Sequence, residues 1–483
     1  MIVEVCLPSG RACTVTLAPE SRGSELKIAA QQHFQLSFLR LVVRGRQLDL
    51  GSTLSQAGLK DQDTVDAIVQ RATLAATDRA FALYVAGGSV VTWGVAGSGG
   101  DSRAVQGQLT GVRHVQAASC AFAALCEDGT VITWGAPPYG GDSSAVREEL
   151  TRACQIQASE AAFAAIRADG TVTTWGDVRK GGDSASVCQQ LTGVQHIQST
   201  TCAFAAIRKD GTVITWGSPS YGGNSSAVQG QLTGVRHIQA NTCSFAAIRE
   251  DGTVISWGNP ECGGDTSAVR GQLTGVCQIQ SATFAFAAIR EDGTVITWGN
   301  PDYGGDCSAV QEQLNGVRQI QATAGAFAAI REDGRVFTWG DPEDGGDSSA
   351  VQEQLTAACQ IQATERAFAA ILEDGVVITW GDPRYGSDSS AVRERGQLTG
   401  VCQIQATERA FAAIRVDGTV IAWGDPSYGG DSSAVREQLT GVCELQATDR
   451  SFGTIRVDGK VIAWGDPRYC SDSCQIQTEI DLL

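Results

Sequence analysis

The chain has 483 residues, with 36 Lys and Arg against 53 Asp and Glu, which gives a net charge of −17. This length allows two or more domains, and the excess of negative charge disfavours contact with the phosphates of a nucleic acid. No apolar run reaches the roughly 18 residues of a membrane-spanning helix, and the first residues have neither the basic nor the apolar region of a secretory signal. We therefore expect a cytoplasmic or nuclear protein that binds neither nucleic acid nor membrane.

Residues 1–71 contain no internal repeat and have a net charge of only +1. Apolar segments that alternate with turn residues such as Ser9-Gly10 predict a β-hairpin, a helix and two further strands. These elements fall, in chain order, at residues 2–7, 12–17, 24–33, 39–44 and 64–69. The order predicts a small α+β roll, so residues 1–71 are expected to form the first domain.

This first domain resembles ubiquitin. The resemblance is carried by LRLVVRGRQL at 39–48, GSTLS at 51–55 and TVDAIV at 64–69. It implies that Val42 and Ile68 match two members of ubiquitin's apolar recognition patch, in which Pro8 replaces the third member, a leucine. No Gly-Gly follows Val69, so the resemblance implies a docking domain read by ubiquitin receptors or the proteasome, not a conjugated modifier. The other interpretation makes Val42 and Ile68 ordinary strand residues without a partner.

From residue 72 onward the chain consists of ten copies of one repeat of about 41 residues. Tryptophan marks the period, because every step between successive tryptophans is 41 residues except the 43-residue step from Trp380 to Trp423. The ten are Trp93, Trp134, Trp175, Trp216, Trp257, Trp298, Trp339, Trp380, Trp423 and Trp464. Such regularity is typical of tandem-repeat proteins, and we expect residues 72–483 to form the second domain.

Each copy is predicted to hold three strands and a short helical turn. In the ninth copy the strands fall at 401–407, 410–416 and 419–424. Asp417-Gly418 between two apolar runs predicts a hairpin with a type I′ turn. The Gly-rich connection after the third strand predicts a helical turn that presents Val435 and Leu439 on one face.

The second and third strands lack a polar face. Phe411 alternates with Ala412 and Val420 alternates with Ile421, so both faces of the sheet need an apolar cover. The neighbouring copies can supply it, and the copies would then be stable only as a stack. This predicts a mainly β fold in the form of a propeller-like array of ten three-stranded repeats. Residues 474–477 repeat the start of a further copy and predict a terminal capping strand.

The repeat resembles that of the regulator of chromosome condensation family. The resemblance is carried by VCQIQ at 276–280, AFAAIREDGTVITWG at 285–299 and YGG at 303–305. It implies a β-propeller, in a family that includes guanine-nucleotide exchange factors and the propellers of large HECT ubiquitin ligases. The copies here are shorter than that family's blades, and their number exceeds the usual about four to eight blades. An open spiral or solenoid is therefore the alternative to a propeller-like ring.

No set of residues typical of catalysis, metal binding or cofactor binding is visible. There is no Ser/His/Asp set, HExxH motif or Walker-type loop, and three of the four histidines occupy one repeat position. The sixteen cysteines include no CxxC pair, and in the reducing compartment expected here they should be free thiols. We therefore expect a protein that is not an enzyme and holds neither metal nor cofactor.

The copies vary mainly at two places. One lies just before the second strand, and the other is the tyrosine before Gly-Gly, which changes to Cys262 and Asp344. Variable loop positions on a constant frame are where a repeat protein is expected to bind. The candidate client surface comprises Glu160, Thr201, Thr242, Glu365 and Arg366.

The two domains together predict a non-catalytic scaffold or adaptor. The ubiquitin-like domain would bind the ubiquitin–proteasome machinery, and the repeats would bind a client protein of unknown identity. The repeat resemblance leaves two alternatives open. One is a guanine-nucleotide exchange factor for a small GTPase, and the other is a ligase-related protein that lacks the HECT catalytic module.

Overall fold

The structure is a computed structural model that describes residues 1–34, 39–69, 72–85, 88–458 and 460–469. The capping strand predicted at 474–477 lies outside these residues. In the described part of the chain, no helix is long and apolar enough to span a membrane.

The N-terminal domain is a five-stranded mixed sheet with one helix. Its elements are β1 (Ile2–Cys6), β2 (Ala12–Thr16), α1 (Gly23–Phe34), β3 (Leu39–Val43), β4 (Arg46–Gln47) and β5 (Asp63–Val69). The strand order is β2-β1-β5-β3-β4, in which β1 and β5 run parallel. Alternate side chains such as Val3, Val5 and Val65 are fully buried against Leu26 of α1. These strands and the helix match the expected positions to within one or two residues.

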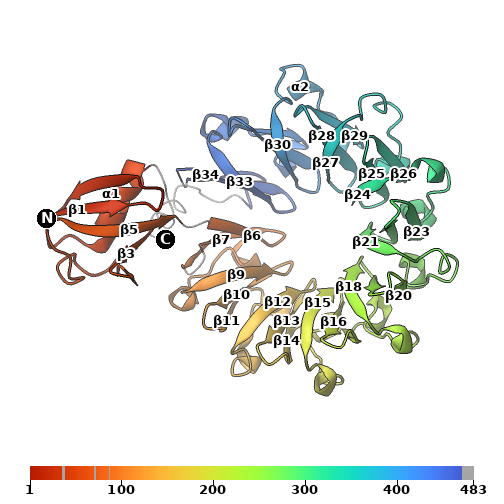
Figure 1. Cartoon of the computed structure of the whole chain (residues 1–483), viewed down its shortest axis with the longest axis horizontal. Coiled ribbons are helices and arrows are strands. Elements are labelled where there is room, and N and C mark those ends of the chain that lie inside the picture. Colours follow the sequence, from red (N-terminus) through yellow and green to blue (C-terminus); the bar gives the residue numbers. More distant parts are fainter. Residues whose placement is uncertain (35–38, 70–71, 86–87, 459, 470–483) are drawn as a thin grey trace.

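The rest of the described chain forms ten separate three-stranded antiparallel sheets, one for each repeat. The first strands are β6 (Ala72–Ala76), β9 (Val112–Ala117), β12 (Ala153–Ala158), β15 (Val194–Ser199), β18 (Val235–Ala240), β21 (Val276–Ser281), β24 (Val317–Ala322), β27 (Ala358–Ala363), β30 (Val401–Ala406) and β33 (Val442–Ala447). They line the inside of the array (Figure 1).

The second strands are β7 (Ala80–Val85), β10 (Ala121–Cys126), β13 (Ala162–Arg167), β16 (Ala203–Arg208), β19 (Ser244–Arg249), β22 (Ala285–Arg290), β25 (Ala326–Arg331), β28 (Ala367–Leu372), β31 (Ala410–Arg415) and β34 (Ser451–Arg456). The third strands are β8 (Val90–Gly94), β11 (Val131–Gly135), β14 (Val172–Gly176), β17 (Val213–Gly217), β20 (Val254–Gly258), β23 (Val295–Gly299), β26 (Val336–Gly340), β29 (Val377–Gly381), β32 (Val420–Gly424) and β35 (Val461–Gly465). The mainly β, propeller-like array of ten repeats is confirmed.

Neighbouring repeats share one apolar core at each junction. Phe452 of the tenth repeat is fully buried against Ala410 and Ala412 of the ninth. In every repeat this phenylalanine stacks on the tryptophan of the third strand, with ring centroids 5.2–5.4 Å apart. The alanines are needed because a larger side chain would hold the sheets apart. The expected cover of both faces by neighbours is therefore observed.

The glycine after the variable tyrosine is required by this junction. Gly140 has φ +85°, and a Cβ there would lie 2.6 Å from Cδ2 of Phe163 in the next repeat. The carbonyl of Gly140 also accepts a hydrogen bond of 3.0 Å from Nε1 of Trp175. Only glycine combines the left-handed backbone with so close an approach to an aromatic ring.

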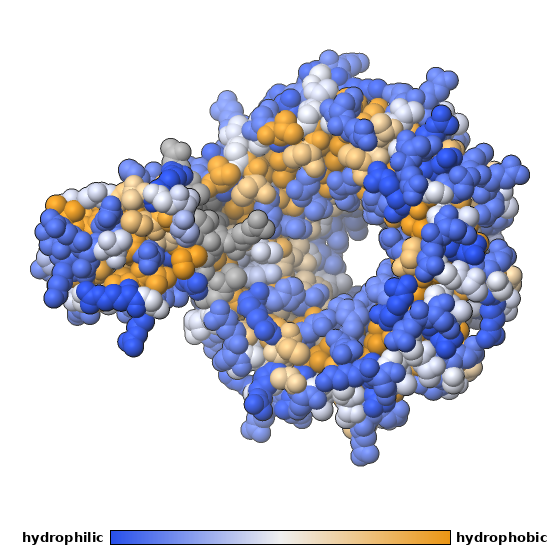
Figure 2. Space-filling model, in the orientation of Figure 1, coloured by the Kyte–Doolittle hydropathy of each residue, from blue (hydrophilic) through white to orange (hydrophobic). Residues whose placement is uncertain are grey.

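The first and tenth repeats also contact each other. Ile455 and Val461 of the tenth repeat share a core with Phe81 and Leu83 of the first, and Leu74 N donates to a carboxylate oxygen of Glu444 at 3.2 Å. The array thus returns on itself around a central opening, and the N-terminal domain lies outside it beside the junction (Figures 1 and 2).

The predicted type I′ hairpin is wrong. Gly418 N donates to Arg415 O at 2.8 Å, and Arg415 N donates to Thr419 O at 2.9 Å, so three residues form the connection. Gly418 has φ +76°, whereas Asp417 keeps a negative φ. The reason is that Oδ1 of Asp417 accepts the N–H of Thr419 at 3.0 Å, which favours a type I turn followed by a left-handed glycine.

The helical turn after the third strand is mostly a 3-10 turn. In the ninth repeat it covers Ser433–Gln438, and Val435 and Leu439 both contact the core between the ninth and tenth repeats, as predicted. In the eighth repeat the corresponding turn is a short helix, α2 (Ser390–Arg393).

Candidate functional site

The turns before the second strands are joined from repeat to repeat along one face of the ring. Ser119 N donates to Glu160 O at 3.0 Å, Glu160 N to Thr201 O at 3.2 Å, and Thr201 N to Thr242 O at 3.2 Å. Three of the five predicted client-surface residues are thus direct neighbours. The turns follow the inner strands, so this row borders the central opening (Figure 1).

The other two predicted residues, Glu365 and Arg366, occupy the same row in the eighth repeat. Ala324 N donates to Glu365 O at 2.8 Å, and Glu365 N donates to Glu408 O at 3.0 Å. The loops that end at the variable tyrosine lie on the same face, just outside this row. Both variable places therefore form one surface, which we call the variable face. The Asp-Gly hairpins lie at the opposite ends of the second strands.

Side chains on the variable face interleave between repeats. The guanidinium of Arg409 lies 4.7 Å from the ring centroid of Tyr385 in the preceding repeat and 4.8 Å from that of Tyr428 in its own. Arg450 continues the series at 4.8 Å from Tyr428, and Arg366 begins it at 5.4 Å from Tyr385. We call these five residues the Arg–Tyr ladder. Cation–π contacts of this kind hold the guanidinium groups at fixed positions.

A buried carboxylate lies next to Arg366, the first residue of the ladder. Asp344 stands where most repeats have tyrosine, is 4% exposed, and lies 3.6 Å from Nε of Arg366. Burial raises the pKa of Asp344 to about 6. A Cβ at position 325 would lie 2.5 Å from Oδ2 of Asp344, so Gly325 makes room for this side chain.

Four carboxylates border the opening beside the ladder. They are Glu365, Glu408, Asp449 and Asp78, which we call the carboxylate arc. Burial, together with the charges of Asp78 and Glu408, raises the pKa of Asp449 to about 7. Burial and neighbouring carboxylates of the arc also raise the pKa of Glu408, and burial raises that of Asp78. The arc thus brings four carboxylates together, each followed in sequence by an arginine, and hydrophilic residues dominate the visible rim of the opening (Figure 2).

In the third and fourth repeats the interleaved residues are different. Lys180 replaces the tyrosine and forms an ion pair with Glu160. Burial raises the pKa of the Cys202 thiol, and the ammonium group of Lys180 beside it offsets part of that rise. Glu160 therefore has an ion-pair partner in its own repeat.

The expectation of free thiols throughout is wrong at one place. Cys243 and Cys262 form a disulfide, with Cα atoms 6.4 Å apart. They occupy the two variable places of the fifth repeat, which the fold brings together although 19 residues separate them in sequence. Twelve other cysteines of the described chain are free.

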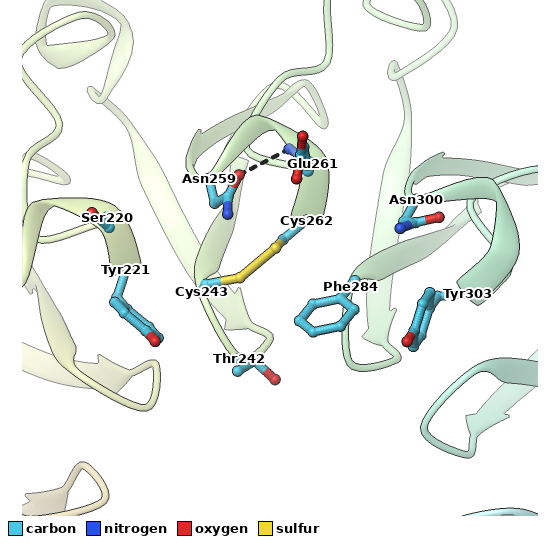
Figure 3. Close-up of a pocket in the computed structure, with 10 residues that line it drawn as sticks. All are labelled: Ser220, Tyr221, Thr242, Cys243, Asn259, Glu261, Cys262, Phe284, Asn300 and Tyr303. Carbon is cyan, nitrogen blue, oxygen red and sulfur yellow. Dashed lines mark hydrogen bonds between the residues drawn. A yellow bond between two sulfur atoms is a disulfide. The ribbon is translucent and has the colours of Figure 1, made fainter.

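A pocket of about 490 Å³ opens over this disulfide. Its lining includes Tyr221, Thr242, Cys243, Cys262, Phe284 and Tyr303. Tyr221 lies on one side of the disulfide and Phe284 on the other (Figure 3), and Phe284 meets Tyr303 edge to face at 4.8 Å between centroids. We call it the disulfide pocket. Among the described residues, no group of three or more His, Cys, Asp or Glu side chains could hold a metal ion.

The N-terminal domain places Val42 and Ile68 close together. Arg40 pairs with Ile68, and Val42 pairs with Asp66, so Val42 and Ile68 are diagonal neighbours on the outer face of the sheet. Both are half-buried, and Pro8 is exposed in the turn between β1 and β2. Asp66 also pairs with Cys6 of β1, which leaves the apolar surface narrow.

The sequence reasoning missed the Arg–Tyr ladder, the disulfide and three carboxylates of the arc. The signal was present, because Asp78, Glu408 and Asp449 occupy the same repeat position as Glu160 and Glu365. The sequence does not show that the turn before the second strand of one repeat lies between two tyrosine loops, that of its own repeat and that of the preceding repeat.

Fold and face together define a class: a circular tandem-repeat protein, mainly β and propeller-like, with its variable residues on one face. No protein-family model and no curated protein sequence matches the chain. Among solved structures, the computationally designed Ika8 protein is similar at a TM-score of 0.30 and 16% identity, over 64% of this chain and 95% of that one. Prp20p from Saccharomyces cerevisiae, whose binding to Gsp1p and histones has been described, is similar at 0.30 and 15%, over 49% and 73%. Likenesses this distant carry no argument about function.

Proposed function

We propose that this protein is a non-catalytic adaptor whose variable face binds a client protein. The observation that carries the proposal is that the positions which differ between copies come together on one continuous face, whereas the frame stays constant. A constant frame with a variable surface is how repeat proteins form binding sites. The half-buried ladder arginines, and the buried tyrosines that they contact, are of the residue types that dominate binding energy at protein interfaces.

We further propose that the N-terminal domain binds the ubiquitin–proteasome machinery. The support is the sheet order β2-β1-β5-β3-β4 with one helix, which is the arrangement of a ubiquitin-like roll, and the adjacent Val42 and Ile68. The apolar pair is small, and such a patch on a small sheet fits a weak, reversible docking contact.

The test is a titration of the full-length protein with a proteasomal ubiquitin receptor, followed by methyl NMR. The methyl signals of Val42 and Ile68 are expected to shift, and Ile68→Glu to weaken binding by about tenfold, or ~1.4 kcal/mol. The matched control is Val416→Glu, since Val416 is 79% exposed in a repeat hairpin. Unshifted Val42 and Ile68 signals with every ubiquitin receptor tested would refute the docking role.

Guanine-nucleotide exchange on a small GTPase is the competing proposal, and the repeat resemblance alone supports it. The same protein is added to a panel of nucleotide-loaded GTPases. Accelerated nucleotide release would favour exchange over the adaptor. Ubiquitin transfer by the chain would contradict the proposal that it is not catalytic. The adaptor proposal expects neither activity.

A further inference from the structure

The disulfide pocket lies at the repeat position of Cys243, where the last three repeats have an arginine. In the ninth repeat, Arg409 lies between Tyr385 and Tyr428, in contact with both rings. Residues 409 and 428 correspond by repeat position to Cys243 and Cys262, and Tyr385 corresponds to Tyr221. The chain itself therefore shows which group fits this environment.

In the fifth repeat that place is empty. A cysteine is too short to reach the ring of Tyr221, and the disulfide holds Cys243 against Cys262 instead. Among the described residues, no Arg or Lys forms a cation–π contact with Tyr221, Phe284 or Tyr303, whereas the ladder tyrosines each contact two arginines. The result is the pocket of about 490 Å³ with aromatic walls.

The polar lining of the disulfide pocket suits a cation. Glu261 lines it, is exposed, and forms no ion pair within the described ranges. Its carboxylate can accept hydrogen bonds from a guanidinium, as can the hydroxyl of Thr242. The net charge of −18 that residues 72–483 carry also favours a basic ligand.

We propose that the disulfide pocket binds the guanidinium group of an arginine side chain presented by a basic segment of a partner protein. The guanidinium stacks against Tyr221 as Arg409 stacks against Tyr385, and Glu261 neutralises its charge. Arginine is preferred to lysine, because a planar guanidinium stacks on an aromatic ring and an ammonium does not. This inference rests on the proposed function, and it specifies the chemistry of the client that the variable face binds.

The test compares hexa-arginine and hexa-lysine peptides, which carry equal charge, by calorimetric titration of the full-length oxidised protein. Hexa-arginine is expected to bind about five- to tenfold more tightly. Tyr221→Ala and Glu261→Gln should each remove most of that preference. Glu343→Gln is the matched control, because Glu343 holds the same repeat position in the seventh repeat and its loss should leave the preference unchanged. Equal binding of the two peptides would overturn the proposal.

A second variant fills the pocket. Cys243→Arg combined with Cys262→Tyr restores the residues of the ninth repeat, so the chain's own guanidinium should occupy the space. This variant is expected to fold, with an unchanged circular dichroism spectrum, and to bind the two peptides equally. If it keeps the full preference for hexa-arginine, arginine binds elsewhere and the proposal is wrong.

This inference and the proposed docking function fail in different experiments. If the protein binds the ubiquitin receptor but shows no preference for hexa-arginine, only the assignment of the pocket is refuted. An arginine preference without any receptor binding would leave the pocket and remove the link to ubiquitin receptors.

Discussion

Asp449 shows, for a single residue, how burial beside other carboxylates changes the titration of an acid. It belongs to the carboxylate arc, and burial beside Asp78 and Glu408 raises its pKa to about 7. An unfolded aspartate has a pKa of about 3.9. Asp449 therefore contributes stability while it is protonated in the folded protein, and this contribution, full below about pH 4, is lost as the pH rises through about 7.

Asp449→Asn is consequently expected to stabilise the protein more at pH 8 than at pH 5. The substitution removes the cost of ionising a buried carboxylate, and that cost is largest at the higher pH. Urea unfolding at both pH values measures the difference. Asp302→Asn, at an exposed position of the same face, is the control and should show no pH-dependent gain. A gain of equal size at both pH values would contradict this reading of the arc.

Ala357 bears a backbone strain that most repeats avoid with a glycine and that Arg152, with φ +59°, shares at the same repeat position. Its φ is +56°, at the position where neighbouring repeats have Gly316 and Gly400 with φ of +61° and +64°. Ala357→Gly should raise the free energy of unfolding by about 1 kcal/mol, because an L side chain is disfavoured in this region. Gly400→Ala should lower it by a similar amount in the same urea titration. A destabilising Ala357→Gly would show that the alanine side chain contributes more than its strain costs.

At the scale of elements, the strands and the junctions followed from the sequence. Apolar strands without a polar face required a neighbour on each side, and the Phe–Trp stacks with their alanine contacts provide it. The hairpin turn was mispredicted because the Asp417 side chain fixes a type I geometry that the Asp-Gly pair alone does not reveal. The disulfide was missed because Cys243 and Cys262 meet only when two loops of one repeat are placed on the same face.

The junction between the first and tenth repeats leaves little room for a side chain at position 453. A Cβ at Gly453 would lie 3.2 Å from Cε1 of Phe81, whereas the ninth repeat has Ala412 at the corresponding position. Gly453→Ala should cost about 1–2 kcal/mol of unfolding free energy through overpacking. The matched variant Ala412→Gly tests an ordinary junction by the same thermal and urea unfolding. If Gly453→Ala leaves stability unchanged, the contact between the first and tenth repeats is looser than described.

At the scale of the whole molecule, one chain carries two proposed binding surfaces, the variable face of the ring and the N-terminal domain. The ring presents its variable face around the opening, and the N-terminal domain lies outside the ring (Figure 1). The number of repeats and the two variable places were readable from the sequence. The return of the array on itself was not, because it depends on contacts between residues more than 350 positions apart, such as Leu74 and Glu444.

The central claim, that the variable face binds the client, is tested most directly by comparing two triple variants in quantitative cross-linking mass spectrometry from cells. One replaces the ladder arginines Arg366, Arg409 and Arg450 with alanine, and the other replaces Arg208, Arg249 and Arg290 of the opposite hairpins. Thermal unfolding confirms that both fold. We predict that the ladder variant loses the client cross-links and keeps those of the N-terminal domain, while the hairpin variant keeps both. Client cross-links that survive in the ladder variant, or disappear only in the hairpin variant, would contradict the account.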